Sequence, residues 1–292
     1  MTIDPIAQTL ADALEQERAG DSNAALEAFD KAKEELPGSV LLNSNRGLLL
    51  ERMGRYAQAL LSFQAAAQLE SNFRDHYKAG NMLLFLERYD EAIKSFQQSI
   101  ACRDDYAEAW VNQGIASHAL TKNDEARRAF DQALSIDSAF YPALRSLAIL
   151  EASIGNGSTA AEYYERAANA QPELLSAWFE LGCARYKNLG EDQVFFEREG
   201  PEGKTIQALD KVIELDPTKQ GAWGRKIGVL FRLVDAAHAT DHAAPRAQAQ
   251  TVSIFPIIHA ELLSTIENAC IQFPQDTWFA DRKNDALAMT NN

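Results

Sequence analysis

The sequence predicts an all-α solenoid built from about seven helical hairpins and closed by a C-terminal helix. Two observations predict it. A phrase of the form Ala, three residues, Phe or Tyr returns every 33 or 34 residues, and each copy places apolar or small residues at the i, i+3, i+4 and i+7 spacing of one helix face. The leading alanines of the five clearest copies are Ala25, Ala59, Ala92, Ala126 and Ala160.

Each copy is long enough for two helices of 12 to 15 residues, here called the first and second helix of a repeat. A small residue recurs twelve positions before each leading alanine, and an aromatic residue recurs four positions after it. We expect the small residue and the leading alanine to let the two helices approach closely, and the aromatic residue to fill the space between one hairpin and the next. The small residues are Ala13, Gly47, Gly80, Gly114 and Ala148, and the aromatic residues are Phe29, Phe63, Phe96, Phe130 and Tyr164.

Two degenerate copies follow, centred on Thr205 and Leu262, and bring the count to seven. One hairpin cannot bury both of its faces, so stacked neighbours are expected to form a single domain over 1–292. A further amphipathic stretch at 277–292, with Trp278 and Phe279, is expected to cover the last hairpin. The expected repeats are 6–39, 40–72, 73–106, 107–140, 141–174, 175–219 with an insertion at 187–204, and 220–276 with an insertion at 236–251.

The residues Trp178-(2)-Leu181-Gly182, Trp110-(3)-Gly114, the recurring Ala-(3)-Phe and the prolines that end second helices resemble the tetratricopeptide repeat family, over roughly 6–274. That resemblance implies a right-handed superhelix whose first helices line a concave groove. It also implies that partner segments bind there.

Mapping the family's groove positions onto this chain selects a polar strip with basic residues at its centre. Asparagine side chains can pair with a peptide backbone, and Arg and Lys select carboxylates, so we expect a partner with an acidic or extended segment. Asn45, Arg74 and Lys78 are similar to three of the five positions of a carboxylate clamp, but Leu10 and Leu14 occupy the other two. The expected groove residues are Ser44, Asn45, Arg74, Tyr77, Lys78, Asn81, Asn112 and Arg145.

The first insertion carries Val194-Phe195-Phe196 among charged residues. In one interpretation, it is a longer helix whose apolar residues fold back on the neighbouring repeat. In the other, the three residues form a second patch for a partner or for self-association. The second insertion is Ala-rich, contains Pro245, and is expected to extend a helix into a loop.

Composition excludes several classes of function. The chain has 28 Lys and Arg against 42 Asp and Glu, a net charge of −14, which repels nucleic acids and anionic membranes. Cys102, Cys183 and Cys270 match no zinc or redox pattern, and the chain shows neither a signal peptide nor an apolar membrane span. We therefore expect a cytoplasmic protein.

No phosphate-binding loop, nucleophile elbow or paired-carboxylate motif is present, so no enzymatic activity and no cofactor or metal is expected. His238 and His242 have the i, i+4 spacing of two metal ligands, with Asp241 close by, but no third ligand accompanies them. The function expected first is a protein-interaction scaffold or adaptor. The alternatives are a dedicated chaperone or assembly subunit of a secretion or modification machine, and a metal-dependent enzyme that uses these histidines.

Overall fold

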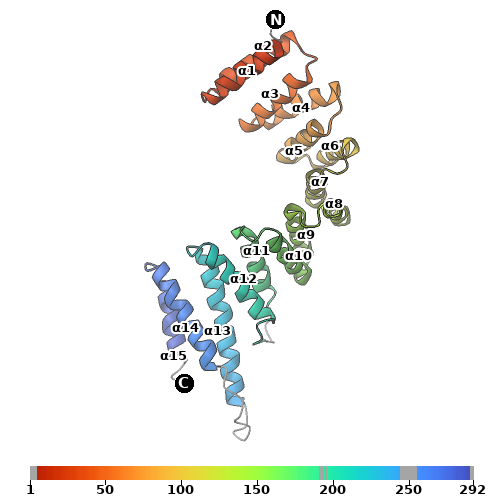
Figure 1. The fold of residues 1–292 in the computed structure, drawn as a ribbon. Coiled ribbons are helices and arrows are strands. Elements are labelled where there is room, and N and C mark those ends of the chain that lie inside the picture. Colours follow the sequence, from red (N-terminus) through yellow and green to blue (C-terminus); the bar gives the residue numbers. More distant parts are fainter. Residues whose placement is uncertain (1–4, 191–193, 195, 244–254, 290–292) are drawn as a thin grey trace. The chain divides into compact units, whose positions relative to one another are not determined.

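The computed structural model describes residues 5–190, 194, 196–243 and 255–289. Over this part of the chain the protein forms fifteen α-helices and no strand (Figure 1). The predicted all-α class is therefore confirmed. Its contacts divide the chain into two compact parts, unit 1 (Met1–Ser146) and unit 2 (Leu147–Asn292).

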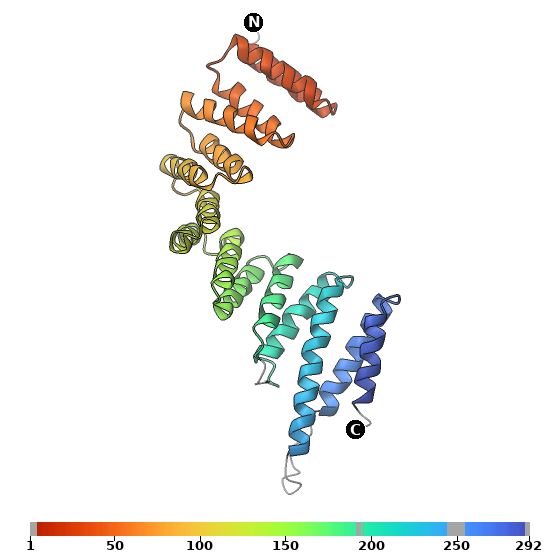
Figure 2. The same ribbon diagram turned by 180° about the vertical axis from the view of Figure 1, so that it is seen from behind.

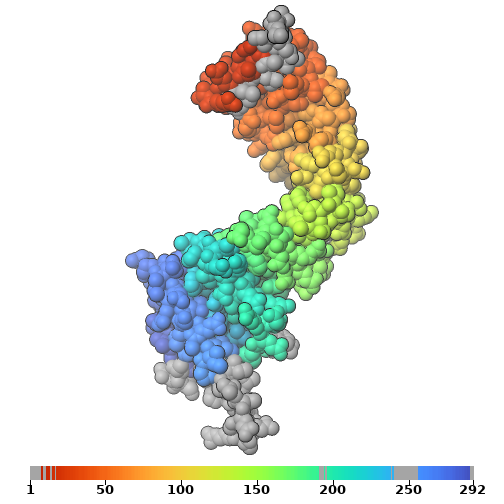
Figure 3. Space-filling model, in the orientation of Figure 1, coloured from red at the N-terminus to blue at the C-terminus, as the bar shows by residue number. Residues whose placement is uncertain are grey.

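Unit 1 consists of successive antiparallel hairpins, in which the helices contact one another pairwise (Figures 1 and 2). In the space-filling view its hairpins follow one another from red through yellow to yellow-green (Figure 3). The first helices α5 and α7 also touch each other, so consecutive repeats present adjacent first helices. The helices are α1 (Pro5–Arg18), α2 (Ser22–Glu35), α3 (Val40–Arg52), α4 (Tyr56–Leu69), α5 (Phe73–Phe85), α6 (Tyr89–Cys102), α7 (Ala107–Ala119) and α8 (Asn123–Ile136), followed by the start of α9 (Tyr141–Ser153).

Unit 2 continues from α9 with the same alternation and ends in a single helix, α15. Phe279 and Ala286 of α15 are buried in one cluster with residues of α13 and α14, among them Leu230 and Leu262. The predicted C-terminal capping helix is confirmed. The remaining helices are α10 (Gly157–Ala170), α11 (Leu175–Lys187), α12 (Pro201–Leu215), α13 (Gln220–Ala243), α14 (Phe255–Gln272) and α15 (Thr277–Ala288).

In three hairpins of unit 1 a glycine of the first helix faces an aromatic ring of the second helix, whereas the sequence pattern predicts that the ring lies between one hairpin and the next. A Cβ atom on Gly80 would lie 2.5 Å from Cε1 of Phe96, and one on Gly47 would lie 2.7 Å from Cε1 of Phe63; Gly114 faces Phe130 in the same way. Phe63, Phe96 and Phe130 are all fully buried. Each of these three first helices thus needs glycine at this position because the ring occupies the volume of a side chain.

A second repeated contact ties four of the first helices to the loops before them. The indole Nε1 of Trp110, Trp178 and Trp223 donates to the carbonyl oxygen six residues earlier, at 2.9, 2.8 and 2.8 Å respectively. Asn43, at the equivalent place in α3, donates to the Pro37 carbonyl at 3.3 Å. The fourth residue of a first helix therefore fixes the connection between successive hairpins.

The turn inside each of the first five hairpins has one residue with positive φ. Gly20, Gly54 and Gly155 supply it at +86°, +72° and +90°. At the equivalent places the chain has Glu87 (φ 57°) and Thr121 (φ 59°), which adopt a conformation that favours glycine.

The two insertions differ from each other. Helix α11 ends at Lys187, so the interpretation of the first insertion as a longer helix is wrong. Its apolar residues Val194 and Phe196 nevertheless fold back on the buried cluster of α13 and α14, and Phe195 lies outside the described residues. The second insertion extends α13 to 24 residues, and 244–254 lies outside the described residues.

Candidate functional site

A large cavity of unit 1 lies where α3 and α5 begin. It has a volume of about 890 Å³, and its walls come from α3, α5 and the corner between α6 and α7. We call it the corner pocket. The lining residues that matter below are Leu41, Ser44, Phe73, Arg74, Lys78 and Tyr106.

A buried carboxylate fixes the floor of the corner pocket. Asp75 is 5% exposed and accepts hydrogen bonds from Ser44 Oγ at 2.8 Å and from Asn72 Nδ2 at 2.5 Å. Asn72 also caps α5, because its Oδ1 accepts from the backbone N–H of Asp75 at 3.0 Å. These bonds set the start of α5 against α3, so Ser44 serves the packing of the two repeats.

An aromatic cluster forms one wall of the pocket. The ring of Tyr106 meets those of Phe73 and Tyr77 edge to face, with centroids 5.1 and 5.0 Å apart. Burial, followed by the neighbouring Tyr77, raises the pKa of Tyr106 to about 12, so its hydroxyl stays uncharged at neutral pH. The wall is therefore apolar with neutral polar edges.

Two arginines lie against Phe73. The guanidinium carbon of Arg103 lies 4.8 Å from the ring centroid, and that of Arg74 lies 5.5 Å from it. Arg103 also forms an ion pair with Asp105 at 2.7 Å. Both cations are thereby held at the edge of the pocket, beside its apolar wall.

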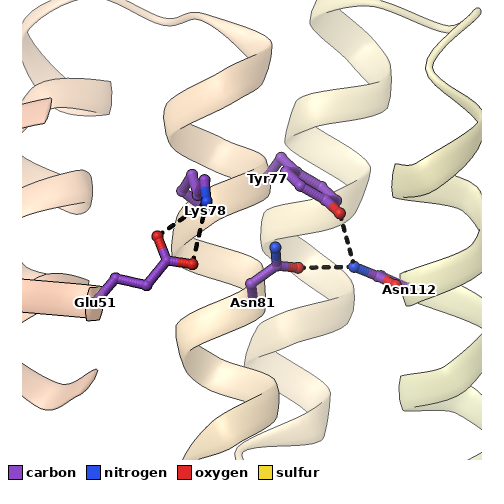
Figure 4. A network of polar contacts seen from close by, with 5 residues as sticks. All are labelled: Glu51, Tyr77, Lys78, Asn81 and Asn112. Carbon is purple, nitrogen blue, oxygen red and sulfur yellow. Dashed lines mark hydrogen bonds and ion pairs between the residues drawn. The ribbon is translucent and has the colours of Figure 1, made fainter. Parts of the chain in front are cut away.

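A polar network links three successive first helices (Figure 4). Lys78 Nζ donates to Glu51 of α3 at 2.9 and 3.1 Å. Asn112 Nδ2 of α7 donates to Asn81 Oδ1 at 2.8 Å and to the Tyr77 hydroxyl at 3.1 Å. The side chains predicted to meet a partner therefore also hold the repeats together.

The structure brings some of the predicted groove residues together and separates others. Ser44, Arg74, Tyr77 and Lys78 line the corner pocket, and Asn81 and Asn112 lie beside it in the polar network. Asn45 donates to the Leu41 carbonyl of its own helix at 2.8 Å, and Arg145 lies exposed on α9.

Sequence reasoning did not select Phe73, Asp75, Arg103 and Tyr106. Their signal was the period itself, because Phe73 and Asp75 at the start of α5 lie beside Arg103 and Tyr106 at the corner of the next repeat. Asn81 and Asn112 are 31 residues apart, and Glu51 and Lys78 are 27 apart, just under one period. Pairs at such separations face each other across adjacent first helices.

The predicted second patch is partly described. Val194 and Phe196 are half-buried against the cluster of α13 and α14, where Phe196 also lines a cavity of about 390 Å³ with Ile206, Leu233 and Ile258. Phe195, the central residue of the prediction, lies outside the described residues.

The histidine site proposed from sequence cannot be placed, since the side chains of His238, Asp241 and His242 lie outside the described residues. Where side chains are described, no group of three or more His, Cys, Asp or Glu is arranged to hold a metal ion. Cys102, Cys183 and Cys270 are all free thiols. None of the helices in the described part of the chain combines the length and apolar character needed to span a bilayer.

Comparison with known proteins identifies the repeat. The profile of the tetratricopeptide repeat family matches residues 77–142, which include α6 and α7. The chain is therefore similar to tetratricopeptide repeat proteins over these residues. It is 30% identical over 100 residues to the small glutamine-rich tetratricopeptide repeat-containing protein 2 of Mycosarcoma maydis, an alignment that covers 34% of this chain and 28% of that protein.

Solved structures of tetratricopeptide repeat proteins share the fold. One from Cytophaga hutchinsonii aligns with 93% of this chain and 98% of its own, with a TM-score of 0.64 at 11% identity. One from Parabacteroides merdae aligns over 97% and 99%, with a TM-score of 0.59 at 13% identity. MamA residues 41 to the end from Desulfovibrio magneticus align over 59% and 98%, with a TM-score of 0.54 at 19% identity. At these identities the similarity shows the fold alone.

Proposed function

We propose that this protein is a non-enzymatic interaction scaffold that binds a segment of a partner protein along the first helices of unit 1. Tetratricopeptide repeat proteins are generally protein-interaction scaffolds. The observation that carries the proposal is the corner pocket, a cavity of about 890 Å³ between adjacent first helices with both apolar and polar walls. The partner segment is extended or helical.

The groove prediction is revised in one respect. Lys78 and Asn112 are engaged with Glu51, Asn81 and Tyr77, so they contribute to the spacing of the repeats. Arg74 remains the partner-facing residue that supports the proposal at the corner pocket, which Ser44 and Tyr77 also line. Asn45, Asn81 and Arg145 extend the proposed contact surface along the first helices.

The test is affinity capture from lysate of the native source, followed by mass spectrometry, with a charge-reversed surface. Leu41→Glu with Arg74→Glu changes two exposed first-helix residues. The matched control, Leu61→Glu with Lys94→Glu, makes the same change on the exposed face of second helices α4 and α6. Both variants are first shown to match the wild type in helicity and melting temperature.

A partner lost from the first variant and retained by the control supports binding along the first helices. The same partners on all three proteins would contradict the proposal. A partner that co-purifies at fixed stoichiometry would indicate a dedicated assembly subunit, and many substoichiometric partners would indicate a general adaptor.

A further inference from the structure

The corner pocket has an exposed apolar surface. Leu41 is 52% exposed at its edge, beside the half-buried Leu48 and Phe73, which also line it. An exposed leucine next to an aromatic ring gains free energy when another apolar group covers it. This part of the pocket therefore fits an aliphatic or aromatic side chain.

The cations that line the pocket differ in whether they form an ion pair within the protein. Lys78 is paired with Glu51, and Arg103 is paired with Asp105. Within the described part of the chain, Arg74 forms no ion pair, and its guanidinium lies over the Phe73 ring. Arg74 is thus the cation of this pocket whose charge is available to a ligand, and it is held next to the apolar wall.

The carboxylates around the pocket limit how much negative charge a ligand can carry. Glu70 and Asp75 line the pocket, and the whole chain has a net charge of −14. These negative charges would repel a run of acidic residues. A single carboxylate placed against Arg74 would instead gain a charge-assisted hydrogen bond.

We infer that the corner pocket recognises a peptide segment by one apolar side chain, seated against Leu41 and Phe73, and one adjacent carboxylate, bound by Arg74. This inference rests on the proposed function and specifies the partner's chemistry. It departs from the clamp-like grouping of Asn45, Arg74 and Lys78, because Asn45 and Lys78 are bonded within the protein.

The experiment selects ligands without a known partner. A random phage-displayed peptide library is panned against the immobilised full chain, and enriched peptides are synthesised with a fluorophore. Their affinities are measured by fluorescence anisotropy for the wild type, Leu41→Ala and Arg74→Gln. The control variants are Leu61→Ala and Lys94→Gln on the second helices.

Enriched peptides are expected to share an apolar residue next to Asp or Glu. Leu41→Ala and Arg74→Gln are each expected to weaken binding on the order of tenfold, and the control variants less than twofold. Replacing the peptide's Glu with Gln should weaken binding to the wild type, yet have little further effect on Arg74→Gln, since the two changes remove one interaction.

Enriched peptides that bind Leu41→Ala and Arg74→Gln as tightly as the wild type would overturn the inference. If such peptides lose affinity with Arg145→Glu instead, the proposed function stands and the corner pocket is not its site. A library that yields no peptide specific to the chain contradicts both the inference about the corner pocket and the proposed function.

Discussion

Lys78 Nζ lies 2.9 Å from Glu51 Oε2, so a cation of α5 is paired with a carboxylate at the end of the preceding first helix. Both side chains are only partly exposed, at 32% and 23%. The pair joins two repeats and removes Lys78 from the charges that a partner would meet.

Reversing this pair tests its role. Lys78→Glu places two carboxylates together and is expected to lower the free energy of unfolding, and adding Glu51→Lys should restore most of the loss. A double-mutant cycle by urea denaturation should give a coupling energy of about 0.5–1 kcal/mol, as for partly exposed pairs. A coupling near zero would show that the ion pair does not stabilise the repeats.

Asn112→Ala removes both hydrogen bonds that α7 donates to α5. The expected loss in the free energy of unfolding is about 1–2 kcal/mol, because Asn81 Oδ1 is left without its donor. Ser146→Ala serves as a control, since its hydroxyl donates only to the Pro142 carbonyl of its own helix. Equal effects of the two substitutions would argue against the inter-repeat role of Asn112.

Gly80→Ala should destabilise the chain by about 1–3 kcal/mol, because the new Cβ would overlap the buried Phe96 ring. Gly38→Ala is the matched control, since a Cβ there meets nothing within 4 Å. Thermal unfolding followed by circular dichroism compares the two. A Gly80→Ala protein as stable as the Gly38→Ala protein would mean that Phe96 can move aside without cost.

Thr121→Gly should stabilise the protein by about 1 kcal/mol, because Thr121 is held at a φ of 59° that glycine adopts without strain. Ala at this position keeps the Cβ atom, so Thr121→Ala should recover little of that gain. The measurement is the urea midpoint of the three proteins. A lower midpoint for the glycine variant would show that flexibility of the unfolded chain outweighs the relief of strain.

His76 makes the stability of unit 1 depend on pH. Burial lowers the pKa of His76 below its ordinary 6.5, with Asp75 and Gln98 opposing the shift. The unfolded chain therefore takes up a proton first as the pH falls. The stability contributed by neutral His76 is present above pH 6.5 and is lost as the pH falls through the lowered value.

The pH dependence is measured against a variant that cannot titrate. Between about pH 7.5 and pH 5, the wild type should lose more unfolding free energy than His76→Gln, as followed by urea denaturation. His118→Gln provides a second comparison at another histidine of unit 1. Identical pH profiles for the wild type and His76→Gln would contradict the burial-driven shift.

The repeat pattern was sufficient to predict helical hairpins, but it did not predict that a glycine faces the aromatic ring of its own hairpin. Gly47, Gly80 and Gly114 face Phe63, Phe96 and Phe130 because both partners recur at fixed positions of a 33- or 34-residue period. The first insertion was predicted less well. Composition suggested a helix, but α11 ends at Lys187, and Val194 and Phe196 are held by contacts with α13 and α14 that local sequence does not encode.

The sequence by itself determined the fold class and the capping helix, since these follow from periodic apolar positions that any stacked neighbour would bury. Only the tertiary structure decided which polar side chains remain available to a partner. Lys78 is paired across repeats whereas Arg74, four residues earlier, lies on Phe73. That difference depends on the directions of the side chains and on Glu51, a carboxylate 27 residues before Lys78. The groove positions read from the sequence carry neither kind of information.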